Sequence, residues 1–96
     1  MITHIVFFKL TDQSPDNIAK SKDMLLGMAG KIPQLRHLEV GIDIIHSERS
    51  YDLALVTKFD SLDYLQAYQI HPYHAGEVLP YMRSVAASVV AVDYEL

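Results

Sequence analysis

Cysteine is absent from the 96-residue chain, so disulfide bonds, cysteine-ligated zinc and thiol catalysis are excluded. Basic residues are also few, eight against twelve acidic ones, and they are scattered along the chain. No basic stripe is therefore available to displace counterions from a nucleic-acid backbone. The four glycines are isolated, and no glycine-rich loop for a phosphate group is present. These absences predict no nucleic-acid partner and no nucleotide-type cofactor loop.

Long hydrophobic runs are missing as well. The longest apolar stretch, VAASVVAV at 85–92, is far too short to span a bilayer. The opening segment MITHIVFFKL is strand-like, and its His4 and Lys9 interrupt any signal-peptide core. We therefore expect a cytoplasmic protein without a membrane partner.

Apolar residues, by contrast, make up half of the chain. This is the upper edge of ordinary globular composition. A single domain of this length has a limited interior, so part of the apolar material is expected at the surface. Apolar surface patches usually belong to a subunit interface or a ligand cleft. The composition alone therefore favours a homodimer.

Alternating apolar residues predict four strands, at 2–10, 38–44, 51–59 and 84–94. Between the first two strands, Ser14 is a helix cap followed by a proline, and Gly30 marks the end of the helix. The buried stripe of this helix is predicted to contain Ile18, Ser21, Leu25, Met28, Ala29 and Ile32.

After the third strand, Asp60 or Ser61 can cap a second helix, which must break at His71 because a proline follows it. That proline can begin a further short helix to about Met82. The order β-α-β-β-α-β predicts an α+β, ferredoxin-like domain over residues 2–95, with helices on one face of an antiparallel sheet. The strands are apolar on both faces, so a second copy of the sheet is the most economical cover for the other face.

Four phrases in this order and spacing resemble the stress-responsive A/B barrel domain (Dabb) family. They are HIVFFKL, IPQLRHLEVG, YDLALVTKFDSLDYLQAYQIHPYH and VDYE. The resemblance covers nearly the whole chain. It implies a dimeric α+β barrel, in which two ferredoxin-like subunits pack sheet to sheet.

The family includes olivetolic acid cyclase, a distantly similar enzyme that closes a polyketide ring without metal or organic cofactor. Its Y-x-x-H-P-x-H segment matches this chain, and the resemblance implies Tyr68 and His74 as a catalytic pair, with His71 between them. The histidine of its first strand matches His4. A further histidine of its cleft corresponds to Leu53, which argues against the same substrate and reaction.

The chemistry of these residue types is consistent with such a pair. A neutral His74 could remove a proton next to a carbonyl, and Tyr68 could donate a hydrogen bond to the developing enolate. His4 could orient either group or the ligand. Tyr64 lies one turn before Tyr68 and His71 about one turn after it, so both share one side of the helix with Tyr68. We expect these two residues, together with His4 from the first strand, to contact a ligand.

Two other interpretations of these residues are a structural role and a metal site. In a structural reading, His71 caps the short helix, while Tyr68 and His74 fasten the helices to the sheet through buried hydrogen bonds, with His4 as an available partner. In a metal site, His71 and His74 would act with Glu77. That pair spans a helix break and three converging ligands are needed, so we predict no metal.

Taken together, the sequence predicts a homodimer that binds a small apolar or aromatic molecule in a cleft between sheet and helices, without a cofactor. A cofactor-independent cyclase or lyase is the first alternative, and a cofactor-free oxygenase of aromatic substrates is a more distant one. A purely structural stress protein is the alternative from another class. It would form larger oligomers and have a cleft closed by side chains.

Overall fold

The structure is a computed structural model that describes all 96 residues. Four strands form a single antiparallel sheet in the order β2-β3-β1-β4. Their bounds are Ile2–Leu10 for β1, His37–Ile42 for β2, Leu53–Phe59 for β3 and Ala86–Glu95 for β4. The predicted α+β class and the ferredoxin-like order of elements are confirmed.

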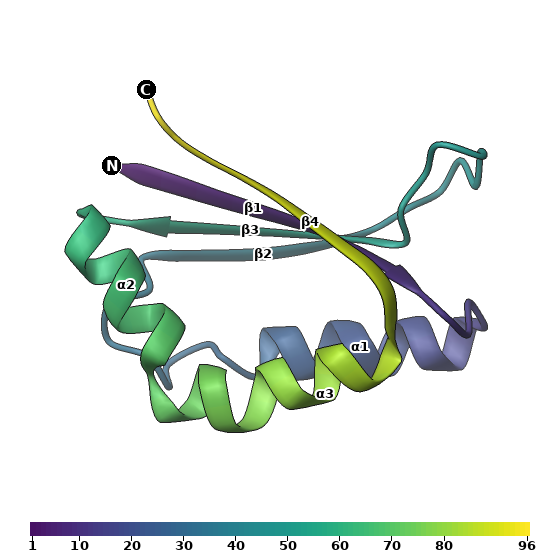
Figure 1. Cartoon of the computed structure of the whole chain (residues 1–96), viewed down its shortest axis with the longest axis horizontal. Helices are drawn as coiled ribbons and strands as arrows, with labels where there is room; N and C mark the ends of the chain where they lie inside the picture. Colours follow the sequence, from purple (N-terminus) through teal and green to yellow (C-terminus); the bar gives the residue numbers. More distant parts are fainter.

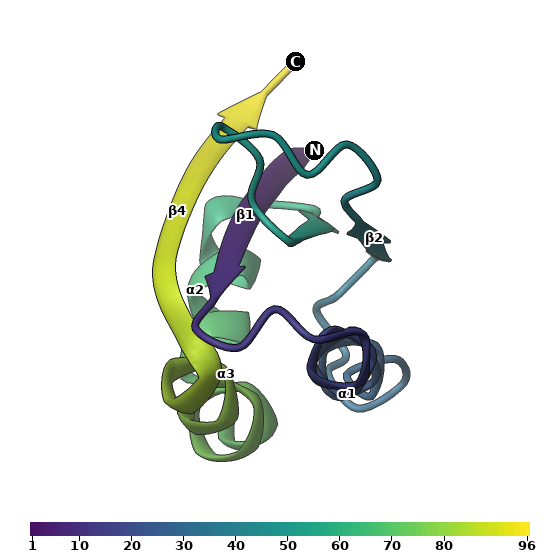
Figure 2. The ribbon, with the colours of Figure 1, turned by 90° about the vertical axis from the view of Figure 1, so that its right-hand side faces the viewer.

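All helices lie on one side of the sheet, and no helix lies on the other side (Figures 1 and 2). The helices are α1 (Pro15–Leu26), α2 (Leu62–Ile70), the π-helical turn η1 (His74–Val78) and α3 (Leu79–Val85). In Figure 2, α1 lies beneath the β2 edge of the sheet and α3 beneath the β4 edge. None of these helices has the length and hydropathy needed to cross a membrane.

Both long helices begin where the sequence predicts. The Ser14 hydroxyl accepts a hydrogen bond from the backbone N–H of Asn17 at 3.3 Å, and the Ser61 hydroxyl accepts one from Tyr64 at 3.3 Å. Ser61 is therefore the cap of α2, out of the two candidates. His71 ends α2 with an extended ψ of 135°, because a following proline disfavours the helical conformation.

The first helix ends earlier than predicted, at Leu26 instead of near Gly30. The N–H of Met28 bonds to the carbonyl of Leu25, three residues back, at 3.2 Å, so the chain tightens into turns. Gly30 then adopts a left-handed φ of 74°, which glycine accepts without a steric penalty. The buried stripe predicted for this segment is correct at Met28 but wrong at Ala29, which is exposed.

The second strand is also shorter than predicted, because it ends at Ile42. The carboxylate of Asp43 accepts a hydrogen bond from the N–H of His46 at 2.7 Å and turns the chain away from the sheet. Ile44, which continues the alternating pattern in the sequence, is 83% exposed. The third strand likewise starts two residues later than predicted, at Leu53.

The helical segment that begins at Pro72 continues to Val85 instead of ending near Met82, and β4 starts at Ala86 instead of Ser84. The π-helical turn η1 lies in this segment directly before α3, and there the N–H of Leu79 bonds to the carbonyl of His74, five residues back. Pro80 follows directly and has no N–H to continue a regular helical ladder. The π-helical turn begins at His74, and turns of this kind occur frequently at functional sites.

The core lies between the sheet and the helices and contains sixteen buried hydrophobic residues. Most of its sheet side comes from alternate residues of β1 and β3. These are Ile2, His4, Val6, Phe8 and Leu10 with Leu53, Leu55, Thr57 and Phe59. The two polar members, His4 and Thr57, lie opposite one another in the register of β1 and β3. This helix-covered side is called the covered face below.

The opposite side of the sheet, called the open face, is apolar as well. The strand registers place seven apolar side chains on it: Ile5, Phe7, Ala54, Val56, Val90, Val92 and Tyr94. Phe7 is 42% exposed and Val92 is 61% exposed. The expectation that the strands are apolar on both faces while the helices cover one is thus confirmed.

Candidate functional site

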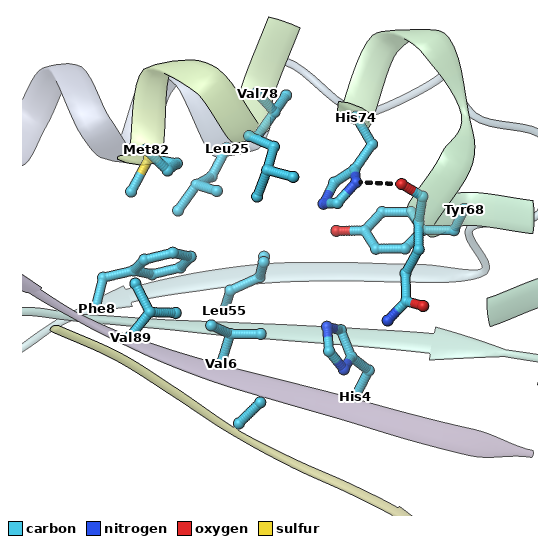
Figure 3. Close-up of a pocket in the computed structure, with 13 residues that line it drawn as sticks. His4, Val6, Phe8, Leu25, Leu55, Tyr68, His74, Val78, Met82 and Val89 are labelled. Carbon is cyan, nitrogen blue, oxygen red and sulfur yellow. Dashed lines mark hydrogen bonds between the residues drawn. The ribbon is translucent and has the colours of Figure 1, made fainter. Parts of the chain in front are cut away.

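A cavity of about 330 Å³ lies between the covered face and the helices. This volume is at the lower end of the range for small-molecule pockets. Ten of the thirteen residues that line the cavity are hydrophobic. Figure 3 shows that the lining has two ends: the rings of His4, Tyr68 and His74 lie together at one end, and Phe8 and Met82 lie at the other. The cavity can therefore hold a molecule that is apolar along most of its length and polar at one end.

Tyr68 of α2 forms the wall between the two histidines and is fully buried. Its ring centroid lies 4.3 Å from that of His74 and 6.2 Å from that of His4. Its hydroxyl donates to the sulfur of Met28 at 3.7 Å, and a thioether is a weak acceptor. Burial raises the pKa of the Tyr68 phenol above its ordinary value, so the group stays a neutral donor.

His74, at the start of η1, faces Tyr68 from the helix side. Its Nδ1 bonds to the backbone carbonyl of Gln69 at 3.1 Å, shown as the dashed line in Figure 3. A carbonyl can only accept, so Nδ1 carries the proton and Nε2 of the neutral ring has a free lone pair. Burial is the main cause that lowers the pKa of His74, and nearby His4 and His71 lower it further, against the opposing effect of the Gln69 carbonyl. His74 is thus built as a hydrogen-bond acceptor or proton acceptor.

His4 approaches the same space from strand β1 and is 8% exposed. Its Nδ1 makes a close contact with the carboxylate of Asp93 on β4, the residue directly opposite it in the sheet. The carboxylate is an acceptor, so Nδ1 of His4 carries a proton and the second ring nitrogen, Nε2, is left for other partners. Figure 3 shows the ring of His4 standing up from the sheet toward the helices.

The structure therefore brings together three of the five predicted site residues, namely His4, Tyr68 and His74. The other two, Tyr64 and His71, do not line the cavity. Tyr64 is 42% exposed, because α2 is short and buries only Leu65 and Tyr68.

His71 has a local structural contact of the kind that the structural reading expects. Its Nδ1 accepts a hydrogen bond from the backbone N–H of Tyr73 at 3.1 Å, at the start of the helix after the break. The other bonds of that reading do not form, since Tyr68 and His74 bond to Met28 and Gln69 instead of to the sheet. No cluster of three or more His, Cys, Asp or Glu side chains has the arrangement of a metal site.

Sequence reasoning missed two parts of this site. The first is Asp93, whose contact with His4 depends on the register between the first and last strands. The second is the apolar half of the cavity, which combines residues from five elements: Phe8, Leu25, Val78, Met82 and Val89. The alternation of Val89, Ala91 and Asp93 in β4 was a signal that these three side chains share one face of a strand.

Comparison with known proteins places this fold in a family. The sequence profile of the Stress Responsive A/B Barrel Domain (Dabb) family matches residues 2–96, and the chain belongs to that family. Among curated proteins, none matches the chain.

Several solved structures are similar over almost the whole chain. A dimeric ferredoxin-like protein of unknown function from Thermobifida fusca is 32% identical, with a TM-score of 0.85 over 99% of this chain and 90% of that one. A dimeric protein of unknown function with a ferredoxin-like fold from Bacteroides fragilis is 31% identical, with a TM-score of 0.83 over 99% and 95%. The hydroxynitrile lyase of Passiflora edulis has a TM-score of 0.85 over 99% and 92%, and its 17% identity shows the shared fold alone.

Proposed function

We propose that this protein binds a small, mostly apolar molecule that carries one hydroxyl or carbonyl group, in the cavity between the covered face and the helices. The observation that carries the proposal is the two-ended lining, with three polar rings at one end of an otherwise hydrophobic cavity. Such a combination of apolar walls with a few convergent polar groups is the usual composition of a ligand pocket.

The polar end has free hydrogen-bonding capacity in both directions. Nε2 of His74 can accept, since Nδ1 is held by the Gln69 carbonyl. The Tyr68 hydroxyl can donate, and a ligand oxygen would be a better acceptor than the thioether of Met28 that it contacts. A phenol or an enol meets both requirements with one oxygen, because it donates through its O–H and accepts at its lone pairs.

Calorimetric titration with 4-butylphenol tests this proposal, with butylbenzene as a probe of the same shape that lacks the hydroxyl. We expect Tyr68→Phe and His74→Ala to weaken binding of 4-butylphenol about three- to tenfold each, as for loss of one hydrogen bond, and to leave butylbenzene unaffected. His37→Ala is the control, because His37 lies on β2 away from the cavity. Absence of binding at millimolar 4-butylphenol, or equal affinity in all variants, would contradict the proposal.

The protein is proposed to act as a homodimer through the open face. The similar proteins from Thermobifida fusca and Bacteroides fragilis are dimeric. The open face offers seven apolar side chains with no helix over them. A second copy, packed sheet to sheet, would bury them and give the α+β barrel that the family name describes.

A second candidate function is proton abstraction without a cofactor, in the manner of a cyclase or lyase. The observation that favours it is the lone pair of Nε2 of His74, held in the cavity next to the Tyr68 phenol. In this reaction a C–H bond next to a carbonyl breaks, the proton moves to Nε2 and the electron pair forms an enolate. The Tyr68 hydroxyl would donate to the enolate oxygen. A hydroxynitrile lyase has the same fold, which shows that the fold can support lyase chemistry.

Deuterium exchange tests this candidate directly. The α-hydrogens of 2-tetralone in D2O, followed by proton NMR, should exchange faster with the protein than without it. We expect His74→Ala to lose about 100-fold or more of this acceleration, since a positioned general base contributes at least that much. Exchange that is unaffected by His74→Ala would rule out His74 as the base.

The purely structural alternative predicts a cleft closed by side chains. The cavity of about 330 Å³ supports ligand binding over that alternative. Native mass spectrometry of the freshly purified protein separates them further. A dimer with a bound organic molecule supports the pocket, and a larger empty ring supports the structural role.

A further inference from the structure

The contact between His4 and Asp93 is not part of the packing of the core, and the proposed roles of Tyr68 and His74 do not use it. The two residues are directly opposite one another on β1 and β4, and the Nδ1 atom of His4 faces an oxygen of the Asp93 carboxylate. The His4 side chain is 10% exposed, whereas that of Asp93 is 44% exposed. The pair thus extends from the sheet side of the cavity, where His4 is buried, to the edge of the sheet, where Asp93 is in contact with solvent.

Asp93 also lies in line with residues of the cavity. Val89 and Ala91, which precede it at intervals of two in β4, both line the cavity. Alternation along the strand therefore places the Asp93 side chain on the covered face, at the rim of the cavity. No helix covers this edge fully, since Val89 remains 51% exposed. The carboxylate keeps part of its hydration and needs no second protein partner.

We propose that Asp93 is a positioning residue: by accepting a hydrogen bond from Nδ1 of His4 it fixes the orientation and tautomer of that ring, so that Nε2 of His4 faces the cavity as a polar contact for the ligand. The ring of His4 can otherwise rotate about its side-chain bonds and carry its proton on either nitrogen. A carboxylate next to Nδ1 removes this freedom. It also places a negative charge next to the ring if Nε2 takes up a proton from the ligand, as carboxylates do in other carboxylate–histidine pairs.

This arrangement makes the polar end two-sided. His74 presents Nε2 from the helix side, held through the Gln69 carbonyl, and His4 presents Nε2 from the sheet side, held through Asp93. Tyr68 lies between the two rings. A ligand oxygen at this end would then contact both layers of the fold. The role of Asp93 for the ligand rests on the proposed function, whereas its effect on the His4 ring does not.

The first test is nitrogen-15 NMR of the histidine rings in the wild-type protein and in Asp93→Ala. We expect the His4 ring of the wild type to carry its proton on Nδ1, and the same ring in Asp93→Ala to show a mixture of tautomers. Asp60→Ala is the matched control, because Asp60 is similarly exposed at 41% and pairs with Arg36 away from the cavity. An unchanged His4 spectrum in Asp93→Ala would overturn the proposal.

The second test measures affinity for 4-butylphenol and butylbenzene in Asp93→Ala, His4→Ala and the double variant. We expect Asp93→Ala to weaken 4-butylphenol about three- to tenfold, as for loss of one hydrogen bond, and to leave butylbenzene unchanged. The double variant should bind no worse than His4→Ala, because residues that act through one another are not additive. A full additive loss in the double variant would show that Asp93 does not act through His4.

The two tests distinguish a failure of the proposed ligand function from a failure of the proposed role of Asp93. If no variant, including the wild type, binds 4-butylphenol but the tautomer of His4 changes in Asp93→Ala, the proposed ligand function is wrong and the positioning of His4 stands. If 4-butylphenol binds and loses affinity in Tyr68→Phe but not in Asp93→Ala, the proposed function stands and Asp93 has no role for the ligand.

Discussion

The two faces of the sheet are made from the same strands and are similarly apolar, yet helices of the same chain cover only one of them. The covered face packs against the helices, holds the core and lines the cavity that contains His4, Tyr68 and His74. No helix covers the open face, and large side chains such as Phe7 and Val92 remain exposed on it. Burial of apolar surface lowers the free energy by about 25 cal/mol for each Å² removed from water. An uncovered apolar face of this kind therefore favours association.

The two faces also differ in the residues that they present. Burial on the open face needs another molecule, and this side has no histidine–tyrosine cluster. The covered face instead gathers His4, Tyr68 and His74 around a space that the helices do not fill. We therefore propose the open face for assembly and the covered face for ligand binding, and the following variants test this division.

The largest effect is expected for Phe59→Ala on the covered face. Phe59 is fully buried, and its ring lies 4.9 Å from that of Tyr68. Removal of such a side chain costs about 3–5 kcal/mol of unfolding free energy, because it loses both burial and packing. Urea denaturation at a fixed protein concentration measures the loss, and Phe59→Leu gives a smaller loss if the alanine variant does not fold. A cost below 1 kcal/mol for Phe59→Ala would contradict the view of the core given above.

The next effect is expected for Val92→Asp, on the open face of strand β4. A carboxylate buried between two sheets without a partner is strongly unfavourable, so we expect the dissociation constant of the dimer to rise about 100-fold or more. Sedimentation equilibrium measures this change. Leu62→Asp is the control, because Leu62 is 59% exposed, close to the 61% of Val92, but lies on α2. Equal behaviour of the two variants would exclude the open face as the interface.

A smaller effect is expected for Ser21→Ala, again on the covered side. Ser21 is fully buried in α1, and its hydroxyl has no hydrogen-bond partner. Its replacement should raise the unfolding free energy by about 1 kcal/mol, because the unpaired hydroxyl is removed and alanine favours the helix. Ser88→Ala is the contrasting variant, since the Ser88 hydroxyl bonds to that of Tyr51 at 3.0 Å. Thermal unfolding of both variants tests the difference, and a destabilised Ser21→Ala would show that the hydroxyl has a partner.

The fold could be predicted from sequence because its signals are local. The alternation in the strands and the side-chain caps at Ser14 and Ser61 each depend on residues only a few positions apart. Element ends were less predictable, since they depend on competing turns. At Ile44 the alternating pattern continued, but the hydrogen bond from His46 to the Asp43 carboxylate ended the strand before it. The π-helical turn before Pro80 likewise has no simple periodic signal.

The site was predictable only in part, because it depends on contacts between distant segments. His4, Tyr68 and His74 were chosen from residue type and resemblance, and the structure brings their rings together. Tyr64 was chosen from helical spacing alone, and spacing does not tell which side of a short helix meets the sheet. Asp93 lies 89 residues from His4 in the chain, and only the register of β1 with β4 brings the two into contact.

The smallest expected effect is the pH response of the covered face through His74. Because burial lowers the pKa of His74 in the folded protein, the unfolded chain binds more protons than the folded one as the pH falls below about 6.5. The unfolding free energy should therefore decrease from that pH downward until the folded pKa is passed, and His74→Gln should reduce this slope. His37→Gln is the control, since His37 belongs to β2 and its ring is 44% exposed. Urea denaturation at pH 7.5, 6.0 and 5.0 gives the comparison. An equal pH slope in the wild type and His74→Gln would mean that His74 is not held in its neutral form by the cavity, and it would remove the main electrostatic difference between the two faces.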